Sequence, residues 1–154
     1  ALCHFGQLNL LDGGRSAIVG DVDAVFCRNV LIYFDEVSRQ SVVRTLYRRL
    51  FPGGYLLLSV PNAGHWSLVA DQAQGRFEYL PWGLTCITHR RWFTEASLQD
   101  ALQEAGLTPR QWEREQPLPS PEGEAFIQTL VQANLGNEAS LRTLQTRVLA
   151  QKTT

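Results

Sequence analysis

The chain has 154 residues, which is enough for one domain with a hydrophobic core. Its formal net charge is −1, so the composition gives no reason to expect broad electrostatic attraction to nucleic acid or to an anionic membrane. No apolar run approaches the roughly 20 residues that a membrane-spanning helix needs. We therefore expect neither nucleic acid nor a membrane as a partner.

The three cysteines, Cys3, Cys27 and Cys86, are widely spaced. No pair of them has the spacing of metal ligands, so we expect no metal site. Isolated cysteines in odd number fit a reduced compartment, and we expect the chain to be cytoplasmic.

The first part of the chain predicts a strand, a helix and a second strand. Residues 22–26 are short and apolar, as in a buried strand. Asp35 is a suitable N-cap for a helix over 36–50, and Pro52-Gly53-Gly54 ends that helix before a nearly continuous apolar strand over 55–60. The face of the helix that packs on the sheet is expected to carry Val43, Leu46, Tyr47 and Leu50. This order predicts a βαβ unit with two parallel strands.

Residues 61–93 form a long segment that is rich in glycine and aromatic residues. Connections of this length are usually functional or partly helical, and we expect a lid-like insertion here. Its aromatic side chains would enclose an acceptor and exclude water, although some of them are expected in the core instead. The aromatic residues are Trp66, Phe77, Tyr79, Trp82, Trp92 and Phe93.

The last third of the chain predicts alternating helices and strands. Thr94 is a suitable N-cap for a helix that ends at Gly106. The core-facing residues of this helix are expected to be Leu98, Ala101, Leu102 and Ala105. The remaining elements are expected at 107–115 (strand), 125–134 and 138–144 (helices) and 147–151 (strand).

Residues 26–34 read Phe-Cys-Arg-Asn-Val-Leu-Ile-Tyr-Phe, a strand end that runs directly into a helix. This pattern is typical of the carboxyl edge of a parallel sheet, where α/β proteins bind ligands. The stretch resembles the fourth-strand motif of the chemotaxis-receptor glutamate methyltransferases. Residues 5–12 are similar to the third-strand segment of that family, and residues 50–56 to the Pro-Gly-Gly turn of class I methyltransferases in general. This resemblance covers about the first sixty residues.

The later part resembles another branch of the same fold. Residues 60–66, 75–79 and 88–94 are similar to segments of small-molecule methyltransferases related to the ubiquinone-pathway enzymes. Both branches are class I enzymes that depend on S-adenosylmethionine (SAM). The two halves therefore imply the same fold and cofactor but different methyl acceptors.

The resemblance implies an α/β fold, a partial Rossmann-like class I methyltransferase sheet that is mostly parallel, with helices on both faces and its first two strands absent. We expect residues 1–154 to be the C-terminal part of one such domain, and the lack of any methionine fits a fragment. The family's glycine-rich turn after the first strand and its acidic residue after the second are absent from the sequence. Cofactor binding by this chain alone is therefore expected to be weak.

Five residues near the N-terminus match the cofactor and acceptor positions of the family. The resemblance implies that Asn9 and Leu10 line the adenosine, that Arg28 and Asn29 lie beside the cofactor, and that Arg28 and Tyr33 approach the reacting methyl group. A guanidinium can hold an acceptor carboxylate with two charge-assisted hydrogen bonds.

Three of these residues have a structural alternative. The alternatives are that Asn9 caps a loop, that Tyr33 packs beneath the helix start, and that Arg28 pairs with Asp23 or Asp35.

His65 and His89 are candidate general bases, because a hydroxyl or amine acceptor must lose a proton during methyl transfer. For His89 the alternative is that its ring holds the loop by hydrogen bonds.

These observations leave three functions open. The first is SAM-dependent methyl transfer to a small molecule, in which this chain supplies the acceptor side and part of the adenosine wall, and the missing half of the domain comes from the same or another chain. The second is a non-catalytic binding or assembly module that retains the fold. The third is a protein carboxylate methyltransferase.

Overall fold

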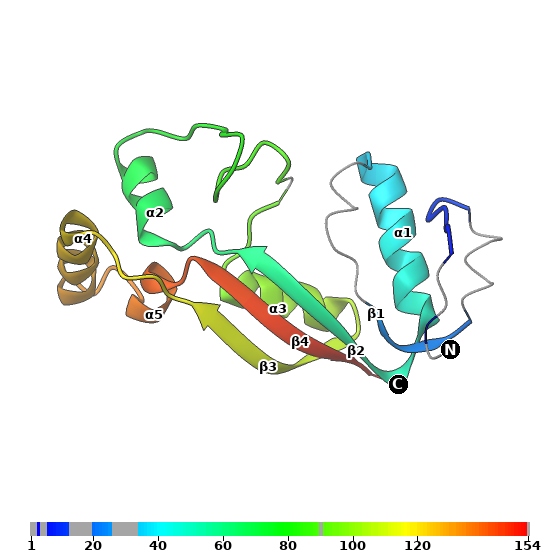
Figure 1. Cartoon of the computed structure of the whole chain (residues 1–154). Helices are drawn as coiled ribbons and strands as arrows, with labels where there is room; N and C mark the ends of the chain where they lie inside the picture. The colour runs from blue at the N-terminus through cyan, green and yellow to red at the C-terminus, as the bar shows by residue number, and fades with distance from the viewer. Residues whose placement is uncertain (1–2, 4–5, 13–19, 26–33, 90, 154) are drawn as a thin grey trace. The chain divides into compact units, whose positions relative to one another are not determined.

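The computed structural model describes residues 3, 6–12, 20–25, 34–89 and 91–153. Within them the chain forms helices and strands in alternation (Figure 1). The elements are β1 (Val22–Val25), α1 (Glu36–Arg49), β2 (Leu50–Pro61), α2 (Trp66–Ala73), α3 (Glu95–Glu104), β3 (Leu107–Glu115), α4 (Pro121–Gln132), α5 (Glu138–Arg142) and β4 (Gln145–Lys152). The α/β fold class predicted from the sequence is confirmed.

The strands form one four-stranded sheet in the order β1-β2-β4-β3. The chain divides into two compact units, residues 1–56 with 151–154, and residues 57–150. Each unit is described by itself.

The first unit contains the predicted βαβ arrangement. β1 runs parallel to β2, with Ala24 opposite Tyr55. The helix α1 between them begins at Asp35, whose carboxylate accepts a hydrogen bond of 2.7 Å from the backbone N–H of Ser38. This N-cap satisfies one of the amide groups that a helix start leaves unpaired, as the sequence predicted.

The prediction for the buried face of α1 is wrong at one position. Val43 is 47 % exposed, whereas its neighbour Val42 is 1 % exposed. Val42, Leu46 and Leu50 follow one another at intervals of four, so they form the inward stripe. Because positions 42 and 43 are both valine, the apolar pattern of the sequence is the same whichever of the two faces inward.

The last strand, β4, runs antiparallel to β2. In the first unit the Gln151 side-chain amide donates to the Gly53 carbonyl oxygen over 2.8 Å. In the second unit Gln145 of β4 contacts Ser59 of β2. From Gln145 to Gln151 along β4, the contacted residue of β2 moves back from Ser59 to Gly53, so the two strands run in opposite directions. The sheet is therefore mixed, with a parallel β1–β2 pair and an antiparallel β2–β4 pair.

The second unit places helices around β2, β4 and β3 (Figure 1). α3 packs on β3, and its buried side chains are Leu98 and Leu102. Ala105, which the sequence placed on the same face, is exposed because the helix ends there. α2 packs on α4 and α4 on α5, so these three helices gather at one end of the strands.

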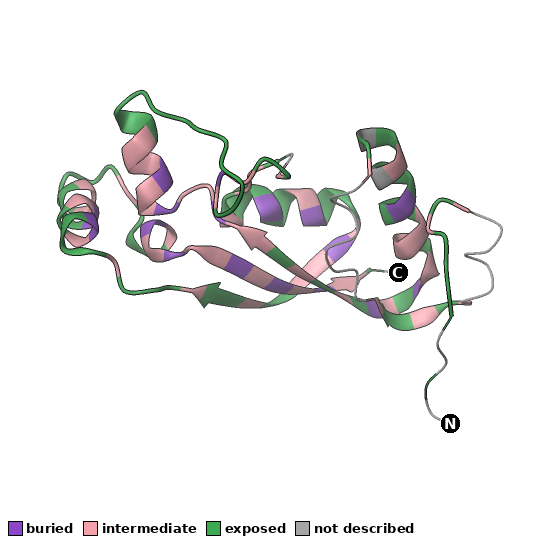
Figure 2. Ribbon diagram, turned by 45° about the horizontal axis from the view of Figure 1, so that its top comes forward, coloured by how far each residue is buried: buried purple, intermediate pink, exposed green. Residues whose placement is uncertain are grey.

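The core of the second unit lies along β4 and the helices that cover it (Figure 2). Every second residue of β4 is buried, namely Thr146, Val148 and Ala150, as expected for a strand with one inward face. Ile127 of α4 is fully buried. β3 has the predicted bounds, while α4 begins four residues before the predicted 125 because Ser120 caps it and Pro121 occupies its first turn.

Candidate functional site

The carboxyl end of β2 is fixed by the side chain of Asn62. Its amide nitrogen donates to the carbonyl oxygens of Ser140 and Thr143, each over 2.8 Å, and its Oδ1 accepts from the N–H of Gly64 over 3.0 Å. Asn62 is only 2 % exposed. The first two bonds tie the end of β2 to α5 and its C-cap, and the third fixes the turn that follows β2. We call this arrangement the Asn62 clamp.

Gly64 lies close to Ser140 beside the clamp. A Cβ atom at this position would collide with the hydroxyl oxygen of Ser140. The turn after β2 therefore approaches α5 as closely as a backbone without a side chain allows.

His65 begins α2 as its N-cap. Its Nδ1 accepts a hydrogen bond from the N–H of Ser67 over 3.4 Å and lies 2.9 Å from the Ser67 hydroxyl. The side chain is 5 % exposed, and burial lowers the pKa of the imidazole below its usual value of 6.5. Nε2 is buried and has no hydrogen-bond partner among the described residues. These contacts support a structural role for His65, because its ring is enclosed and its Nδ1 lone pair is occupied.

His89 holds the loop that precedes α3. Its Nδ1 lies 3.1 Å from the carbonyl oxygen of Leu84, and the indole N–H of Trp92 donates to the same oxygen over 3.0 Å. A carbonyl only accepts hydrogen bonds, so Nδ1 carries the proton and Nε2 keeps its lone pair in the neutral ring. The loop-holding alternative for His89 is thereby present in the structure, and a base function at Nε2 stays a prediction.

The aromatic residues predicted for the lid fall into different groups. Phe77, Tyr79 and Trp92 contact one another, with ring centroids 5.5–5.8 Å apart. Trp82 is 74 % exposed, and Trp66 packs on α4 at Gly123. The lid-like character of 61–93 stays a prediction, as does the assignment of 1–154 to a single partial domain. The helix α2 within this segment was not predicted.

A cleft of about 430 Å³ lies next to the Asn62 clamp, and we call it the α3/α5 cleft. Its lining includes the hydroxyl-bearing residues Thr94, Ser140, Thr143 and Thr146. Asn62, Gln99 and Asn137 add amide groups.

The charged residues that line the described part of the α3/α5 cleft are paired with each other. The guanidinium of Arg114 donates from Nε and Nη2 to the two carboxylate oxygens of Glu95, over 2.7 and 2.6 Å. This two-pronged contact raises the pKa of Arg114. The cleft as a whole therefore carries no net charge.

Thr146 adds unused hydrogen-bonding capacity to this lining. It is 2 % exposed, and its hydroxyl has no partner among the described residues. A buried hydroxyl without a hydrogen-bond partner costs about 1–3 kcal/mol of stability. A ligand atom that forms a hydrogen bond with it would remove this cost.

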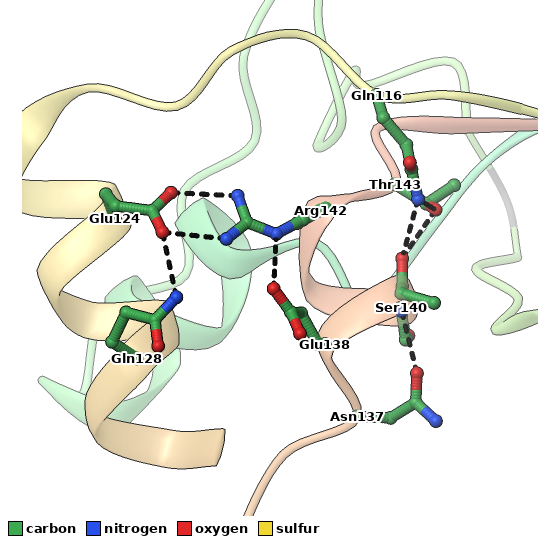
Figure 3. Close-up of polar contacts among 9 residues, drawn as sticks. Gln116, Glu124, Gln128, Asn137, Glu138, Ser140, Arg142 and Thr143 are labelled. Atoms are coloured by element: carbon green, nitrogen blue, oxygen red, sulfur yellow. Dashed lines mark hydrogen bonds and ion pairs between the residues drawn. The ribbon is translucent and has the colours of Figure 1, made fainter. Parts of the chain in front are cut away.

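A network of ion pairs joins α4 to α5 beside this cleft (Figure 3). Arg142 donates to both carboxylate oxygens of Glu124 over 2.7 and 2.8 Å and to Glu138 over 2.9 Å. The guanidinium lowers the pKa of Glu124 to about 2. Gln128 donates to the same carboxylate over 2.9 Å. All four residues are engaged with one another, which fits a structural tie between the helices.

The predicted cofactor residues lie in the N-terminal part. Asn9 forms an exposed turn, in which its Oδ1 accepts from the N–H of Leu11 over 3.0 Å and its carbonyl oxygen accepts from the N–H of Asp12 over 3.1 Å. This geometry agrees with the loop-capping alternative, and Leu10 next to it is half-buried. Their role toward adenosine stays a prediction.

Arg28, Asn29 and Tyr33 lie outside the described residues, so their predicted roles also stay predictions.

The sequence did not single out Asn62 or the α3/α5 cleft. The signal for Asn62 was an amide directly after a buried strand, followed two residues later by glycine. The cleft left no local signal, because its walls come from several separate segments spread over residues 62–146.

The described residues contain no cluster of three or more His, Cys, Asp or Glu with the geometry of a metal site. No helix in this part of the chain combines the length and the apolar character that a bilayer crossing requires.

Comparison with known proteins supports the resemblance stated above. Residues 1–76 match a family model for a SAM-binding methyltransferase domain, which confirms the similarity to class I SAM-dependent methyltransferases for this part of the chain. The model is that of the "CheR methyltransferase, SAM binding domain". Because the matching model describes a SAM-binding domain, it also confirms S-adenosylmethionine as the predicted cofactor.

The curated relatives match over about two fifths of the chain. "Chemotaxis protein methyltransferase 2" of Vibrio cholerae is 46% identical over 55 residues, which are 36% of this chain and 19% of that protein. The "Chemotaxis protein methyltransferase" of Escherichia coli is 43% identical over 61 residues, which are 40% of this chain and 19% of the relative. The chain thus spans about a fifth of the length of these relatives.

Among solved structures, the magnesium protoporphyrin IX methyltransferase (ChlM) of Synechocystis with bound SAH aligns with a TM-score of 0.47 and 15% identity. The alignment covers 95% of this chain and 49% of that one. The similarity of residues 60–94 to small-molecule methyltransferases stays a prediction, as does the cytoplasmic location.

Proposed function

We propose that this chain supplies the acceptor side and part of the adenosine wall of a SAM-dependent methyltransferase. The observation that carries this proposal is the match of residues 1–76 to a SAM-binding methyltransferase domain. The matched segment includes Asn9, Arg28 and Asn29, the residues that the sequence analysis assigned to the cofactor side.

We propose further that the acceptor is a protein carboxylate rather than a small-molecule hydroxyl or amine. The curated relatives carry the name chemotaxis protein methyltransferase, which favours a protein acceptor. A carboxylate is already ionised at neutral pH, so it needs no base to become a nucleophile. The enclosed ring of His65 agrees with this chemistry, because a carboxylate acceptor makes no use of it.

The contribution of this chain would then be binding and orientation. Arg28 would hold the acceptor carboxylate with two parallel hydrogen bonds and align one oxygen with the methyl group. When bound, SAM supplies an electrophilic methyl group on a sulfonium. Alignment gives most of the rate in such a displacement, so a positioning guanidinium is sufficient.

The residues present do not make a complete SAM site. The sequence lacks the glycine-rich turn that lets a backbone approach the cofactor closely, and it lacks the acidic residue for the ribose hydroxyls. We therefore expect residues 1–154 alone to bind SAM more weakly than micromolar, and calorimetric titration of this chain measures that affinity. Micromolar binding by the isolated chain would contradict this expectation.

The acceptor is tested with the protein in its native full length and SAM labelled in the methyl group. The acceptors offered are a peptide with glutamate side chains and, separately, a phenol. Mild alkali releases methanol from a methyl ester but not from a methyl ether, so the label in volatile methanol identifies a carboxylate acceptor. Label that resists alkali, or transfer to the phenol alone, would rule out the carboxylate.

Two variants separate the candidate residues. Arg28→Lys keeps the charge but loses the two-pronged contact, so we expect turnover on the peptide to fall at least tenfold with little loss of stability. His89→Gln removes the lone pair at Nε2, and we expect it to leave ester formation unchanged. A loss of turnover in His89→Gln would instead favour a hydroxyl or amine acceptor that needs a base.

The non-catalytic module remains the alternative if the full-length protein binds SAM and transfers no methyl group to either acceptor.

A further inference from the structure

The α3/α5 cleft is a candidate site of its own, because its walls are almost entirely outside the segment that matches the methyltransferase family. Of its lining residues, Asn62 lies within residues 1–76, and the others lie between 94 and 146. Its volume of about 430 Å³ falls within the usual range of small-molecule sites, about 300–1,000 Å³. All of its lining belongs to the second unit.

The walls of the cleft are held in place by contacts that a ligand would not have to create. The Asn62 clamp fixes the end of β2 to α5. Thr94 and Ser97 form a capping box at the start of α3, and the side chain of Asn137 accepts from the N–H of Ser140 over 2.9 Å at the start of α5. A preformed site costs less ordering on binding than a flexible one.

The chemistry of the lining indicates which ligands fit. Hydroxyl and amide groups both donate and accept hydrogen bonds, so those that the protein does not already use complement a ligand whose groups also do both. The amide of Asn62 and the hydroxyl of Thr143 are already bonded within the protein. Glu95 and Arg114 neutralise each other, so the lining offers no unbalanced charge to an anion or a cation. The hydroxyl of Thr146 adds a buried group without a partner among the described residues.

We propose that the α3/α5 cleft binds a small uncharged molecule that carries several hydroxyl groups, of about the size of a monosaccharide. The proposal does not rest on the methyl transfer proposed above. No aromatic ring is among the lining residues that the structure describes, so the ligand gains hydrogen bonds without ring stacking. We therefore expect affinity on the order of millimolar.

Saturation-transfer NMR on the whole chain tests this proposal. The probes are D-glucose and myo-inositol as neutral polyols, with glucose 6-phosphate and L-glutamate as charged comparisons. The expected result is saturation transfer to at least one neutral polyol and weaker transfer to the charged probes. No transfer to either neutral polyol at about ten times the expected dissociation constant, or a preference for glucose 6-phosphate, would overturn the proposal.

Variants locate the binding. Gln99→Ala changes an exposed side chain of the lining, and we expect this variant to weaken polyol binding several-fold. Its control is Gln103→Ala, one turn further along α3 and outside the lining, which should leave polyol binding unchanged. Thr146→Val removes only the buried hydroxyl and should weaken binding about tenfold. Its control is Thr129→Val, an exposed threonine of α4. Equal binding in the lining variants and their controls would place the ligand elsewhere and refute the assignment.

The ion pair offers a separate check on ligand charge. In Glu95→Gln the guanidinium of Arg114 loses its carboxylate partner, so the cleft gains a positive charge. We expect this variant to bind glucose 6-phosphate more tightly than the unmodified chain does, by about tenfold. Unchanged binding of the phosphate would show that Arg114 does not face the ligand.

Discussion

The packing of α2 on α4 depends on the absence of a side chain at Gly123. A Cβ atom there would lie 2.7, 2.8 and 2.9 Å from three ring atoms of Trp66. Carbon atoms pack comfortably at about 3.5–4.0 Å, so in Gly123→Ala the indole or the helix has to move by about 1 Å. Such overpacking costs about 1–3 kcal/mol.

The same substitution also has a favourable term. Alanine is a better helix former than glycine by up to about 1 kcal/mol. We therefore expect Gly123→Ala to lower the free energy of unfolding by about 0–2 kcal/mol in the unmodified chain. In a Trp66→Leu background the collision is absent, so the same change should be neutral or stabilising.

The decisive quantity is the coupling energy from the double-mutant cycle, which we expect at about 1–3 kcal/mol. Urea unfolding followed by circular dichroism measures it without depending on tryptophan fluorescence. The control background is Trp82→Leu, because Trp82 is 74 % exposed. A coupling energy below about 0.5 kcal/mol between positions 123 and 66 would refute the packing described for α2 and α4.

Three further predictions concern buried or ion-paired side chains. Asn62→Ala removes the clamp and leaves carbonyl oxygens without their donor, so thermal unfolding should show a loss of about 2 kcal/mol or more. Burial lowers the pKa of His65, so below pH 6.5 the unfolded chain takes up a proton that the folded chain does not. The free energy of unfolding then falls by up to about 1.4 kcal/mol for each unit of decreasing pH. The variant His65→Asn keeps an N-cap but has no imidazole, so it should reduce this slope. An unchanged slope would show that His65 titrates as an exposed group. The pKa of Glu124 is lowered to about 2 by Arg142, so its stabilising contribution is present above pH 4.5 and is lost as the pH falls toward 2. Glu124→Gln should flatten acid unfolding in this range and Glu104→Gln should not; equal acid profiles for the two variants would argue against the ion pair.

The helices with strong end signals were predictable from the sequence. Asp35 and Thr94 cap α1 and α3, and Gly106, with a φ of +74°, follows the end of α3 in a conformation that favours glycine. α2 was missed for two reasons. Its N-cap is His65, which is not among the preferred capping residues. Its eight residues also lie within an aromatic segment that has no clear helical periodicity.

The candidate site was less predictable, because its geometry depends on contacts between distant segments. The hydrogen bonds of Asn62 to α5 span 78 and 81 residues. An asparagine after a strand reads equally well as a ligand for a cofactor or as a loop cap. Only the three-dimensional partners show that its amide is used to hold α5.

The two histidines illustrate why residue type alone does not identify a base. Both were chosen because an imidazole titrates near neutral pH, yet their surroundings differ. His65 is buried and uses Nδ1 to cap a helix, so protonation would cost the N-cap and put a positive charge at the helix start, where the dipole is unfavourable. His89 uses Nδ1 as a donor to the Leu84 carbonyl, which leaves Nε2 as the unprotonated nitrogen. If a hydroxyl acceptor were methylated after all, His89 would be the better candidate base, because the basic nitrogen of His65, Nδ1, already accepts from Ser67.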